Sequence, residues 1–340
     1  MSAAPAYDFG VLLPSAGVFG GVRRFVEIGN ELVRRGHRYV LYTPRGVEPE
    51  WTRFEGDVRA LESLAGAQHD VILCNDPALH ARFHDARAAV RVFYFALEGI
   101  DNESRIVRSG WTLAANSEGM HRYLRRRWGA RAHRVVGGID LELFQPRSNV
   151  PREESEFRVL VFGRVSRRRK GVDVARRAVE GFARAVGGGR TVKLVLFDHI
   201  GPGSDADPRA LFRTRVPHEW YLNEPQSQLP RLYSSCDLFL SAEKRAGWAN
   251  TVAEAMACGL PVVCTRSGTL DLARHRETAW VARFRHPWFL RRGLGALHAD
   301  AALAARLRAA ALARVARFGW PRVVDQLLDL VAAELPSATG

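Results

Sequence analysis

Residues 241–264, which read SAEKRAGWANTVAEAMACGLPVVC, carry the side chains whose types and spacing best fit a binding site. Asn250 and Thr251 are good helix starters, and Gly259 ends the short apolar helix that they begin. Backbone N–H groups at a helix start attract phosphate, and Gly247 lets the preceding backbone approach a ligand closely. The stretch therefore predicts a phosphate site beside Gly247, Trp248, Asn250 and Thr251.

Glu254 lies one turn into the same predicted helix. Its carboxylate can accept two hydrogen bonds from a sugar diol such as a ribose. A second interpretation stays open at this stage: Glu254 and Thr251 form a capping box, which only satisfies the helix start.

A second candidate site for an anion follows an apolar run at 157–162 that predicts a strand. Arg164 and Lys170 are six residues apart in the loop between this strand and the next helix, so both can turn onto one diphosphate. Judged alone, they are equally well explained as surface charges. The arginines between them, at 167–169, are expected to be solvated.

The first part of the chain predicts a βαβ unit with a glycine-bearing turn at Gly20 and Gly21. The turn stands between a strand at 7–13 and a helix, and a second strand follows at 38–43. The glycine spacing is not G-x-G-x-x-G, and no acidic residue follows the second strand, so a nicotinamide cofactor is disfavoured. From the turn alone, two interpretations stay open: it binds a phosphate, or it is a tight turn that binds no ligand.

Length and composition predict two domains and no membrane span. The 340 residues are 47% hydrophobic, enough for two cores of ordinary size. No window is long and apolar enough to cross a bilayer, and the N-terminus lacks a signal pattern, so we expect a soluble, cytoplasmic protein. The four cysteines lack metal-ligand spacing and are expected to be reduced core residues.

The net charge of +14 arises mainly in the second half of the chain and from arginine. A basic surface suits polyanionic donors or anionic lipid headgroups. Nucleic-acid binding is disfavoured as the main function, because polybasic tails and aromatic residues interleaved with basic ones in the manner of RNA-binding segments are missing.

The run AGWANTVAEAMACGLPVV resembles the signature of the retaining family-4 glycosyltransferases, a set of glycosyl transferases group 1 with the GT-B architecture. In that signature a glutamate, seven residues and a second glutamate precede Ala-Met-Ala-x-Gly-x-Pro-Val. Glu254 matches the second glutamate, which in the family holds the nucleotide ribose. The first glutamate falls on Ala246, and the nearest carboxylate, Glu243, is three residues out of register.

The resemblance also assigns roles outside the signature. The family's Gly-Arg and Lys-Gly pairs hold the donor phosphates, which makes Arg164 and Lys170 the candidate catalytic cations. Glu98 stands near the place of a family histidine and is our candidate for contact with the acceptor or the sugar. The implied donor-binding residues are Gly20, Gly21, Arg164, Lys170, Leu222, Asn223, Gly247, Trp248, Asn250, Thr251 and Glu254, and no metal ligand is implied.

The fold that the resemblance implies is two facing Rossmann-like, doubly wound parallel α/β domains with a cleft between them. We expect an acceptor-side domain at 1–147, a nucleotide-sugar domain at 148–317, and a helix at 318–340 that crosses back to the first domain. The implied reaction is retaining, metal-independent transfer of a hexose from a nucleotide-diphosphate sugar to a hydroxyl, with no cofactor other than that co-substrate.

The acceptor is a glycan, a lipid-linked molecule or a natural product, and peripheral contact with the inner membrane surface is compatible with the basic charge. Two alternatives remain. Because Ala246 removes a carboxylate, the chain can be a sugar-nucleotide-binding protein without transferase activity. A nucleotide-sugar epimerase is the second, although it needs acid and base side chains for which Glu98 is the main candidate.

Overall fold

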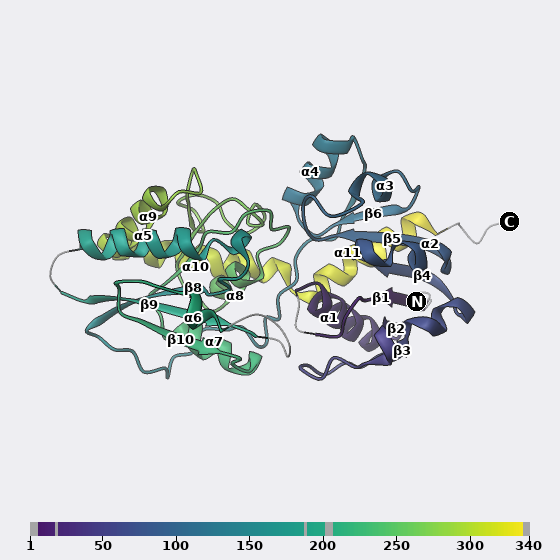
Figure 1. The fold of residues 1–340 in the computed structure, drawn as a ribbon, viewed down its shortest axis with the longest axis horizontal. Helices are drawn as coiled ribbons and strands as arrows, with labels where there is room; N and C mark the ends of the chain where they lie inside the picture. Colours follow the sequence, from purple (N-terminus) through teal and green to yellow (C-terminus); the bar gives the residue numbers. More distant parts are fainter. Residues whose placement is uncertain (1–5, 18–19, 187–188, 201–206, 336–340) are drawn as a thin grey trace. The chain divides into compact units, whose positions relative to one another are not determined.

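The computed structural model describes residues 6–17, 20–186, 189–200 and 207–335. The chain forms two compact units, Met1–Gly138 with Trp320–Gly340 and Ile139–Gly319. Each unit contains one parallel β-sheet and its own helices (Figure 1).

The elements of the first unit follow one another in alternation. The strands are β1 (Asp8–Leu12), β2 (Arg38–Thr43), β3 (Asp57–Ala60), β4 (Gln68–Cys74), β5 (Arg87–Phe95), β6 (Thr112–Ala115) and β7 (His133–Arg134). The helices are α1 (Gly20–Arg34), α2 (His80–Asp85), α3 (Glu103–Val107), α4 (Glu118–Trp128) and α11 (Trp320–Glu334), with 3-10 turns η1 (Pro44–Gly46), η2 (Leu61–Gly66) and η3 (Pro77–Leu79).

The second unit repeats the pattern. Its strands are β8 (Glu156–Phe162), β9 (Thr191–Asp198), β10 (His218–Leu222), β11 (Leu238–Ser241), β12 (Val262–Cys264) and β13 (Trp280–Val281). Its helices are α5 (Val172–Ala185), α6 (Pro208–Leu211), α7 (Leu229–Ser234), α8 (Asn250–Ala257), α9 (Pro287–Ala299) and α10 (Ala301–Val315), with 3-10 turns η4 (Arg168–Lys170), η5 (Gln226–Gln228) and η6 (Ala316–Phe318).

Both sheets have the strand order of doubly wound nucleotide-binding folds. The first is β3-β2-β1-β4-β5-β6-β7 and the second is β10-β9-β8-β11-β12-β13, and the paired strands run parallel. In each sheet the first three strands are added in one direction and the remaining strands in the other. The two directions separate between β1 and β4 in the first sheet and between β8 and β11 in the second, and we call this place the reversal point. Loops that leave these two neighbours diverge, so ligands of such folds bind there, beyond the carboxyl ends of the strands.

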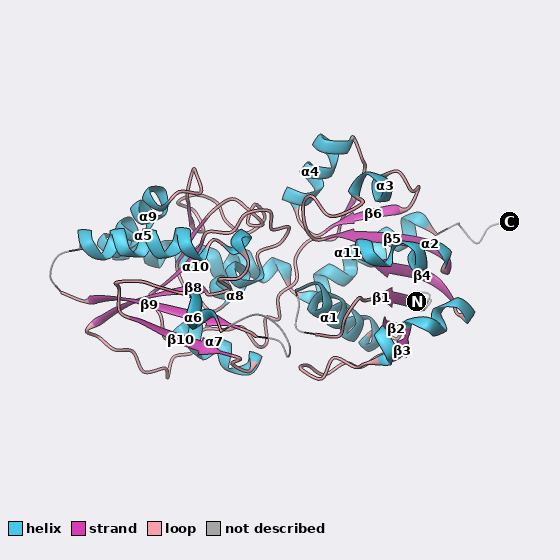
Figure 2. Ribbon diagram, viewed as in Figure 1, coloured by secondary structure: helices cyan, strands magenta, loops and turns pink. Residues whose placement is uncertain are grey.

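Helices cover both faces of the sheets because alternate strand residues are apolar on each side (Figure 2). In β4, Val71 and Leu73 belong to the core that includes residues of α1 and α11, whereas Ile72 and Cys74 belong to a second core with residues of α2, α3 and α4. The core of the second unit is formed by β8 and β9 with α5, α9 and α10.

Several elements differ from the sequence expectations. Residues 139–147, expected in the first domain, belong to the second unit, where the Phe144 ring lies 6.2 Å from that of Tyr233. The short strands β3, β7, β10 and β13 were not predicted. All are edge strands of their sheets with partly exposed residues, and so lack the continuous apolar run of the central strands.

The four cysteines are free and buried, as predicted. Burial raises the pKa of the Cys74, Cys236 and Cys264 thiols to about 12. Within the described ranges, no helix is long and apolar enough to cross a membrane.

We expect Gly138→Ala to destabilise the first unit, because a Cβ at this φ of 115° would overlap the Trp320 ring. Gly110→Ala is the matched control, since Gly110 also has a positive φ, 77°, but open space around its Cα. The expected loss in the free energy of unfolding is about 3 kcal/mol for Gly138→Ala and about 1 kcal/mol for the control, measured by urea denaturation. Equal losses would show that Trp320 does not restrict this position.

Candidate functional site

The candidate site lies at the carboxyl edge of the second sheet, at the point where its strand order reverses. The loop after β8, residues 163–171, leads into α5, and the loop after β11, residues 242–249, leads into α8. Gly171, with φ of 74°, lies so close to the second loop that a Cβ would overlap the Ala242 carbonyl oxygen. The Lys244 N–H donates to the Arg169 carbonyl at 2.9 Å. The two loops are therefore in direct contact.

Lys170 and Glu243 form an ion pair across this reversal point. The Lys170 Nζ lies 3.0 and 2.9 Å from the two carboxylate oxygens of Glu243. The Glu243 residue is 4% exposed, and its carbonyl accepts a hydrogen bond from the Thr265 hydroxyl at 2.7 Å. A buried carboxylate thus fixes the ammonium group of one predicted phosphate-binding residue.

Arg164, the other predicted cation, is held by the end of β9. Its Nε donates to the Asp198 carboxylate at 3.1 Å, and its Nη2 donates to the His199 carbonyl. Burial raises the pKa of Asp198 above its usual value, while the Arg164 charge opposes that shift. Burial is the main cause that lowers the pKa of His199, and the positive charge of Arg164 lowers it further.

A row of aromatic rings joins these cations to α8. The Lys170 Nζ and the Arg164 Cζ lie 5.1 and 5.8 Å from the centre of the Phe162 ring. Phe162 lies 5.3 Å from Phe197, and Phe197 lies 5.6 Å from Tyr233. The Tyr233 hydroxyl donates a hydrogen bond to Glu254 of α8, so packed side chains connect the two cations to this helix.

Glu254 is 4% exposed and accepts a hydrogen bond from the Tyr233 hydroxyl at 2.8 Å. The Thr251 hydroxyl is buried and has no hydrogen-bond partner in the part of the chain that the structure describes. The hydroxyl half of a capping box is therefore absent, and Glu254 is instead oriented by a side chain from α7.

The start of α8 has no side chain as a cap. Its first N–H groups and the positive end of its dipole are thus suited to an anion. Gly247 is buried beside it, Asn250 is partly exposed, and Trp248 is 7% exposed with a buried ring Nε1 that lacks a partner among the described residues. Unpartnered buried donors are rare in proteins, so the Trp248 Nε1 and the Thr251 hydroxyl are both unusual features of this segment.

Leu222 and Asn223, which were predicted to bind the donor, lie at the end of β10. Leu222 is the last residue of that strand, paired with Asp198. Asn223 has a φ of 58° and donates its N–H to the Asp198 carbonyl at 3.0 Å. Its Oδ1 accepts a hydrogen bond from the Ile200 N–H at 2.7 Å, so its side chain is used at least partly in the turn.

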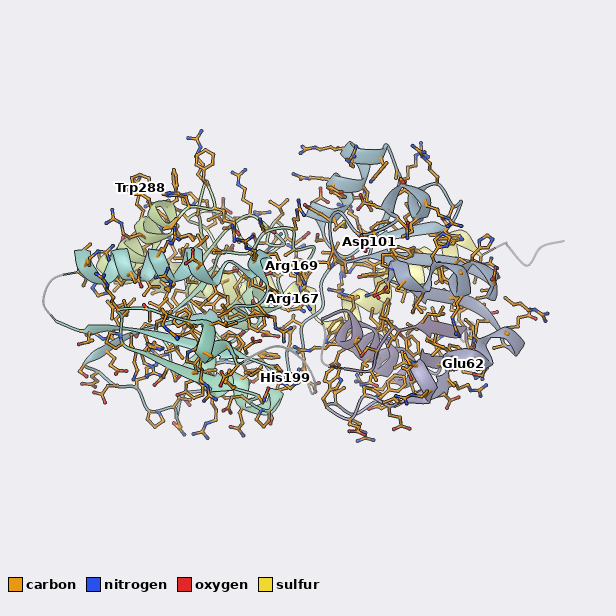
Figure 3. The ribbon with its side chains drawn as sticks, viewed as in Figure 1. Glu62, Asp101, Arg167, Arg169, His199 and Trp288 are labelled. Carbon is orange, nitrogen blue, oxygen red and sulfur yellow. The ribbon has the colours of Figure 1, made fainter. Side chains whose placement is uncertain are left out.

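The three arginines between Arg164 and Lys170 differ in their exposure to solvent. Arg167 and Arg168 are exposed, as predicted, but Arg169 is partly buried (Figure 3). Burial lowers the pKa of Arg169, and nearby Glu243 opposes the shift. The expectation that all three are solvated is wrong for Arg169, because its segment packs against the loop after β11.

Gly20, Gly21 and Glu98 belong to the first unit, so they are described apart from the residues above. Gly20 and Gly21 begin α1, and a Cβ at Gly21 would lie 2.6 Å from the Asn75 Nδ2. Asn75 follows β4, so this close approach also crosses a reversal point. Glu98 follows β5 and is partly exposed, and its charge contributes to raising the pKa of Tyr123, for which burial is the main cause.

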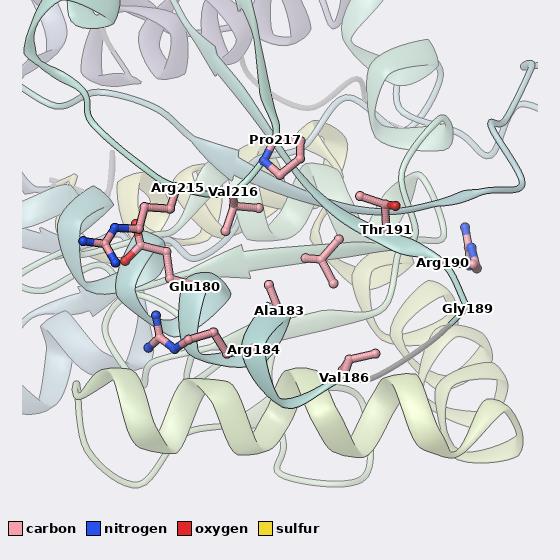
Figure 4. Close-up of a pocket in the computed structure, with 11 residues that line it drawn as sticks. Glu180, Ala183, Arg184, Val186, Gly189, Arg190, Thr191, Arg215, Val216 and Pro217 are labelled. Carbon is pink, nitrogen blue, oxygen red and sulfur yellow. The ribbon is translucent and has the colours of Figure 1, made fainter.

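A pocket of about 420 Å³ lies at the opposite edge of the second sheet, where β9 and β10 begin (Figure 4). Glu180, Arg184, Arg190 and Arg215 line it with apolar neighbours. None of the predicted site residues takes part in it. Among the described residues, no group of three or more His, Cys, Asp or Glu side chains is placed to hold a metal ion.

Four residues of the site were not identified from the sequence as ligands or supports. Phe162 was predicted only as the last residue of a strand, Asp198 and Tyr233 had no predicted role, and Glu243 was noted only as a carboxylate out of register. For Asp198 a signal existed, since it follows the apolar run of a central strand. The ion pair of Glu243 had no local signal, because Lys170 is 73 residues away in the chain.

Residues 156–300 match the family model described as Glycosyl transferases group 1. The D-inositol 3-phosphate glycosyltransferase 1 of Catenulispora acidiphila is 30% identical over 261 residues, which are 71% of this chain. The chain spans 62% of that relative's length.

Two solved structures have the same fold. Anabaena HepE in complex with UDP and glucose superposes with a TM-score of 0.76 over 96% of this chain and 100% of that chain, at 15% identity. Sucrose-phosphate synthase from Thermosynechococcus elongatus gives 0.75 over 96% and 98%, at 17% identity. The predicted fold class, two Rossmann-like parallel α/β units of the GT-B kind, is confirmed.

Lys170→Met should lower the free energy of unfolding by about 3 kcal/mol, because it leaves a buried carboxylate without its partner. Glu243→Gln should be milder, since Lys170 keeps a 19% exposed side chain that water can reach. The double variant should recover most of the loss of Lys170→Met in urea denaturation.

Arg122→Met is the control for this cycle. The Arg122 side chain is 50% exposed and pairs with Glu118 on the surface, so its loss should change stability by less than about 1 kcal/mol. A loss for Lys170→Met no larger than this would mean that the buried ion pair does not hold the two loops.

Proposed function

Residues 156–300 form a glycosyl transferases group 1 domain, and from this premise we propose that the chain transfers a sugar from a nucleotide-diphosphate sugar to a hydroxyl. The observation that carries the proposal is the pair of cations, Arg164 and Lys170, each fixed by a carboxylate at the reversal point of the second sheet. A diphosphate is the ligand that two preorganised cations and an uncapped helix start suit best.

The nucleoside would lie along the row of aromatic rings towards α8. Glu254 binds the ribose diol in this arrangement, and Tyr233 orients its carboxylate. The backbone N–H groups at Trp248, Asn250 and Thr251 take the phosphates, for which the uncapped start of α8 is the support. Leu222 and Asn223 lie against the edge of the base.

The chemistry needs negative charge to be stabilised where it develops. As the bond between the sugar C1 and the diphosphate oxygen breaks, the leaving group gains charge, and Arg164 and Lys170 neutralise it in place of a metal ion. The acceptor hydroxyl forms the new bond to C1, and its proton passes to the leaving phosphate. Glu98 contacts the acceptor or the sugar.

The finer assignments follow the relatives. The curated relative is named for D-inositol 3-phosphate, and the HepE structure contains UDP and glucose, so we propose a hexose donor and an inositol-type or glycan hydroxyl as acceptor. Retention of the anomeric configuration is proposed on the resemblance to the family-4 enzymes.

Calorimetric titration with UDP, GDP and ADP and their sugar conjugates, without added metal, tests the donor site first. We expect one nucleotide diphosphate to bind, which identifies the base, and its sugar conjugate to be consumed only when an acceptor is supplied. Binding without transfer to any hydroxyl acceptor would favour a sugar-nucleotide-binding protein instead. No binding to any of the three would overturn the donor-site assignment.

Glu254→Gln should weaken binding of the selected nucleotide about tenfold, because an amide oxygen is a weaker acceptor for the ribose hydroxyls than a carboxylate. Tyr233→Phe is the matched control, since it removes the hydrogen bond that orients Glu254 and leaves the carboxylate in place, and it should have a smaller effect. Calorimetry of the nucleotide and of its 2′,3′-dideoxy analogue checks the assignment. An equal loss of affinity for both ligands on Glu254→Gln would contradict a contact with the ribose.

A further inference from the structure

Three aromatic side chains cluster at the start of α9, of which Phe284 and Trp288 are exposed and Phe289 is partly buried against the core. Phe284 and Trp288 are 54% and 44% exposed, and both rings contact Phe289, at centroid distances of 5.1 and 4.8 Å. Figure 3 shows Trp288 at the surface of the second unit. Single exposed apolar residues are ordinary, but large exposed side chains in mutual contact mark an interaction surface. We name Phe284, Trp288 and Phe289, with Arg283 and Arg292 beside them, the aromatic–arginine surface.

The two exposed rings of the cluster lie apart from the residues that attach α9 to its own unit, among which Phe289 packs against the core. Leu290, Leu294 and Leu297 of α9 are buried in the core of the second unit with residues of α5. Phe284 and Trp288 therefore lie outside the apolar face that fixes the helix.

Guanidinium groups frame the aromatic rings. The Arg283 Cζ lies 5.3 Å from the centre of the Phe284 ring, and the Arg292 Cζ lies 4.9 Å from that of Trp288. The segment 283–292, RFRHPWFLRR, contains four arginines and no carboxylate. Apolar rings and positive charge thus occupy the same surface, with no acidic residue from this segment to oppose them.

The surface adjoins the candidate site. Arg285, which follows Phe284, donates through Nε to the Ala242 carbonyl at 2.7 Å and through Nη2 to the Arg168 carbonyl at 3.3 Å. One arginine therefore links the exposed aromatic cluster to both loops that meet at the reversal point.

We propose that the aromatic–arginine surface binds the interface of a bilayer that contains anionic lipid. Tryptophan and phenylalanine gain by entering the boundary between headgroups and acyl chains, and arginines at the same level are attracted to anionic headgroups. A soluble acidic partner would match the arginines but offers no apolar layer for rings that stand out from the surface. A bilayer matches both.

The consequence for the reaction rests on the proposed function. A chain held by this surface presents its donor-site loops beside the membrane, so the acceptor hydroxyl belongs to a lipid or to a lipid-linked glycan. Binding to vesicles requires no donor and no acceptor, so its outcome is independent of whether the transfer reaction is correct.

Sedimentation with vesicles of phosphatidylcholine alone, or with added phosphatidylglycerol, tests the proposal on the full chain. We expect binding to the anionic vesicles and its loss in about 1 M salt, where the Debye length is about 3 Å. Phe284→Ala and Trp288→Ala should each weaken the partition coefficient roughly tenfold by removing apolar area. Arg283→Gln and Arg292→Gln should each weaken it about fivefold.

Two controls match these changes in chemistry and exposure. Leu211→Ala removes an apolar side chain that is 55% exposed elsewhere in the second unit, and Arg306→Gln removes an exposed arginine of α10. Neither should alter vesicle binding, and the thermal unfolding of all variants should match that of the wild type.

Quenching of tryptophan fluorescence by brominated lipid locates the contact. Wild type should be quenched and Trp288→Phe should lose most of that quenching. Absence of binding to anionic vesicles would overturn the proposal. So would binding that Phe284→Ala and Trp288→Ala leave unchanged, or self-association or RNA binding that depends on Trp288 while vesicle binding does not.

Discussion

The candidate site depends on one close approach, between Gly171 and the Ala242 carbonyl. Any side chain at 171 would overlap that oxygen, and the φ of 74° is one that glycine adopts without strain. Because the loop after β8 can pass so close to the loop after β11, Lys170 reaches the carboxylate of Glu243. A partly exposed ammonium and a buried carboxylate stabilise one another best at such short range, so the backbone contact supports the ion pair.

The strand order explains why these two loops meet at all. β8 and β11 are neighbours in the sheet, but the connections from them turn in opposite directions, which leaves their carboxyl ends open to a ligand. The first unit uses the same arrangement with different residues, since Gly21 approaches Asn75 across the ends of β1 and β4. In both units a glycine approaches the neighbouring segment closely at the reversal point, and in the second unit that point is lined with fixed cations.

The sequence predicted the elements that local patterns determine. The bounds of β2 and the start of α8 agree with the structure, because an apolar run marks the strand and helix-starting residues mark the helix. The side chains that position the site residues were harder to predict, because they come from distant segments of the chain. Tyr233 hydrogen-bonds to Glu254, and Glu243 forms an ion pair with Lys170. Local capping rules favoured a capping box for Thr251 as strongly as a ligand, and only the packing of α7 against α8 distinguishes the two.

The loop that departs from the family signature is itself closely packed. Ala246 is 7% exposed, its N–H donates to the Ser267 hydroxyl at 2.8 Å, and a Cβ at Gly268 would lie 2.9 Å from the Ala246 Cβ. The Ala249 N–H also donates to the Gly268 carbonyl, at 2.9 Å. Two small residues thus fit against each other where the signature has a glutamate, and a longer side chain at 246 would have to leave this packing. The carboxylate that the structure does place in this loop, Glu243, is already bound to Lys170, so here the loop contributes to the site by positioning a cation.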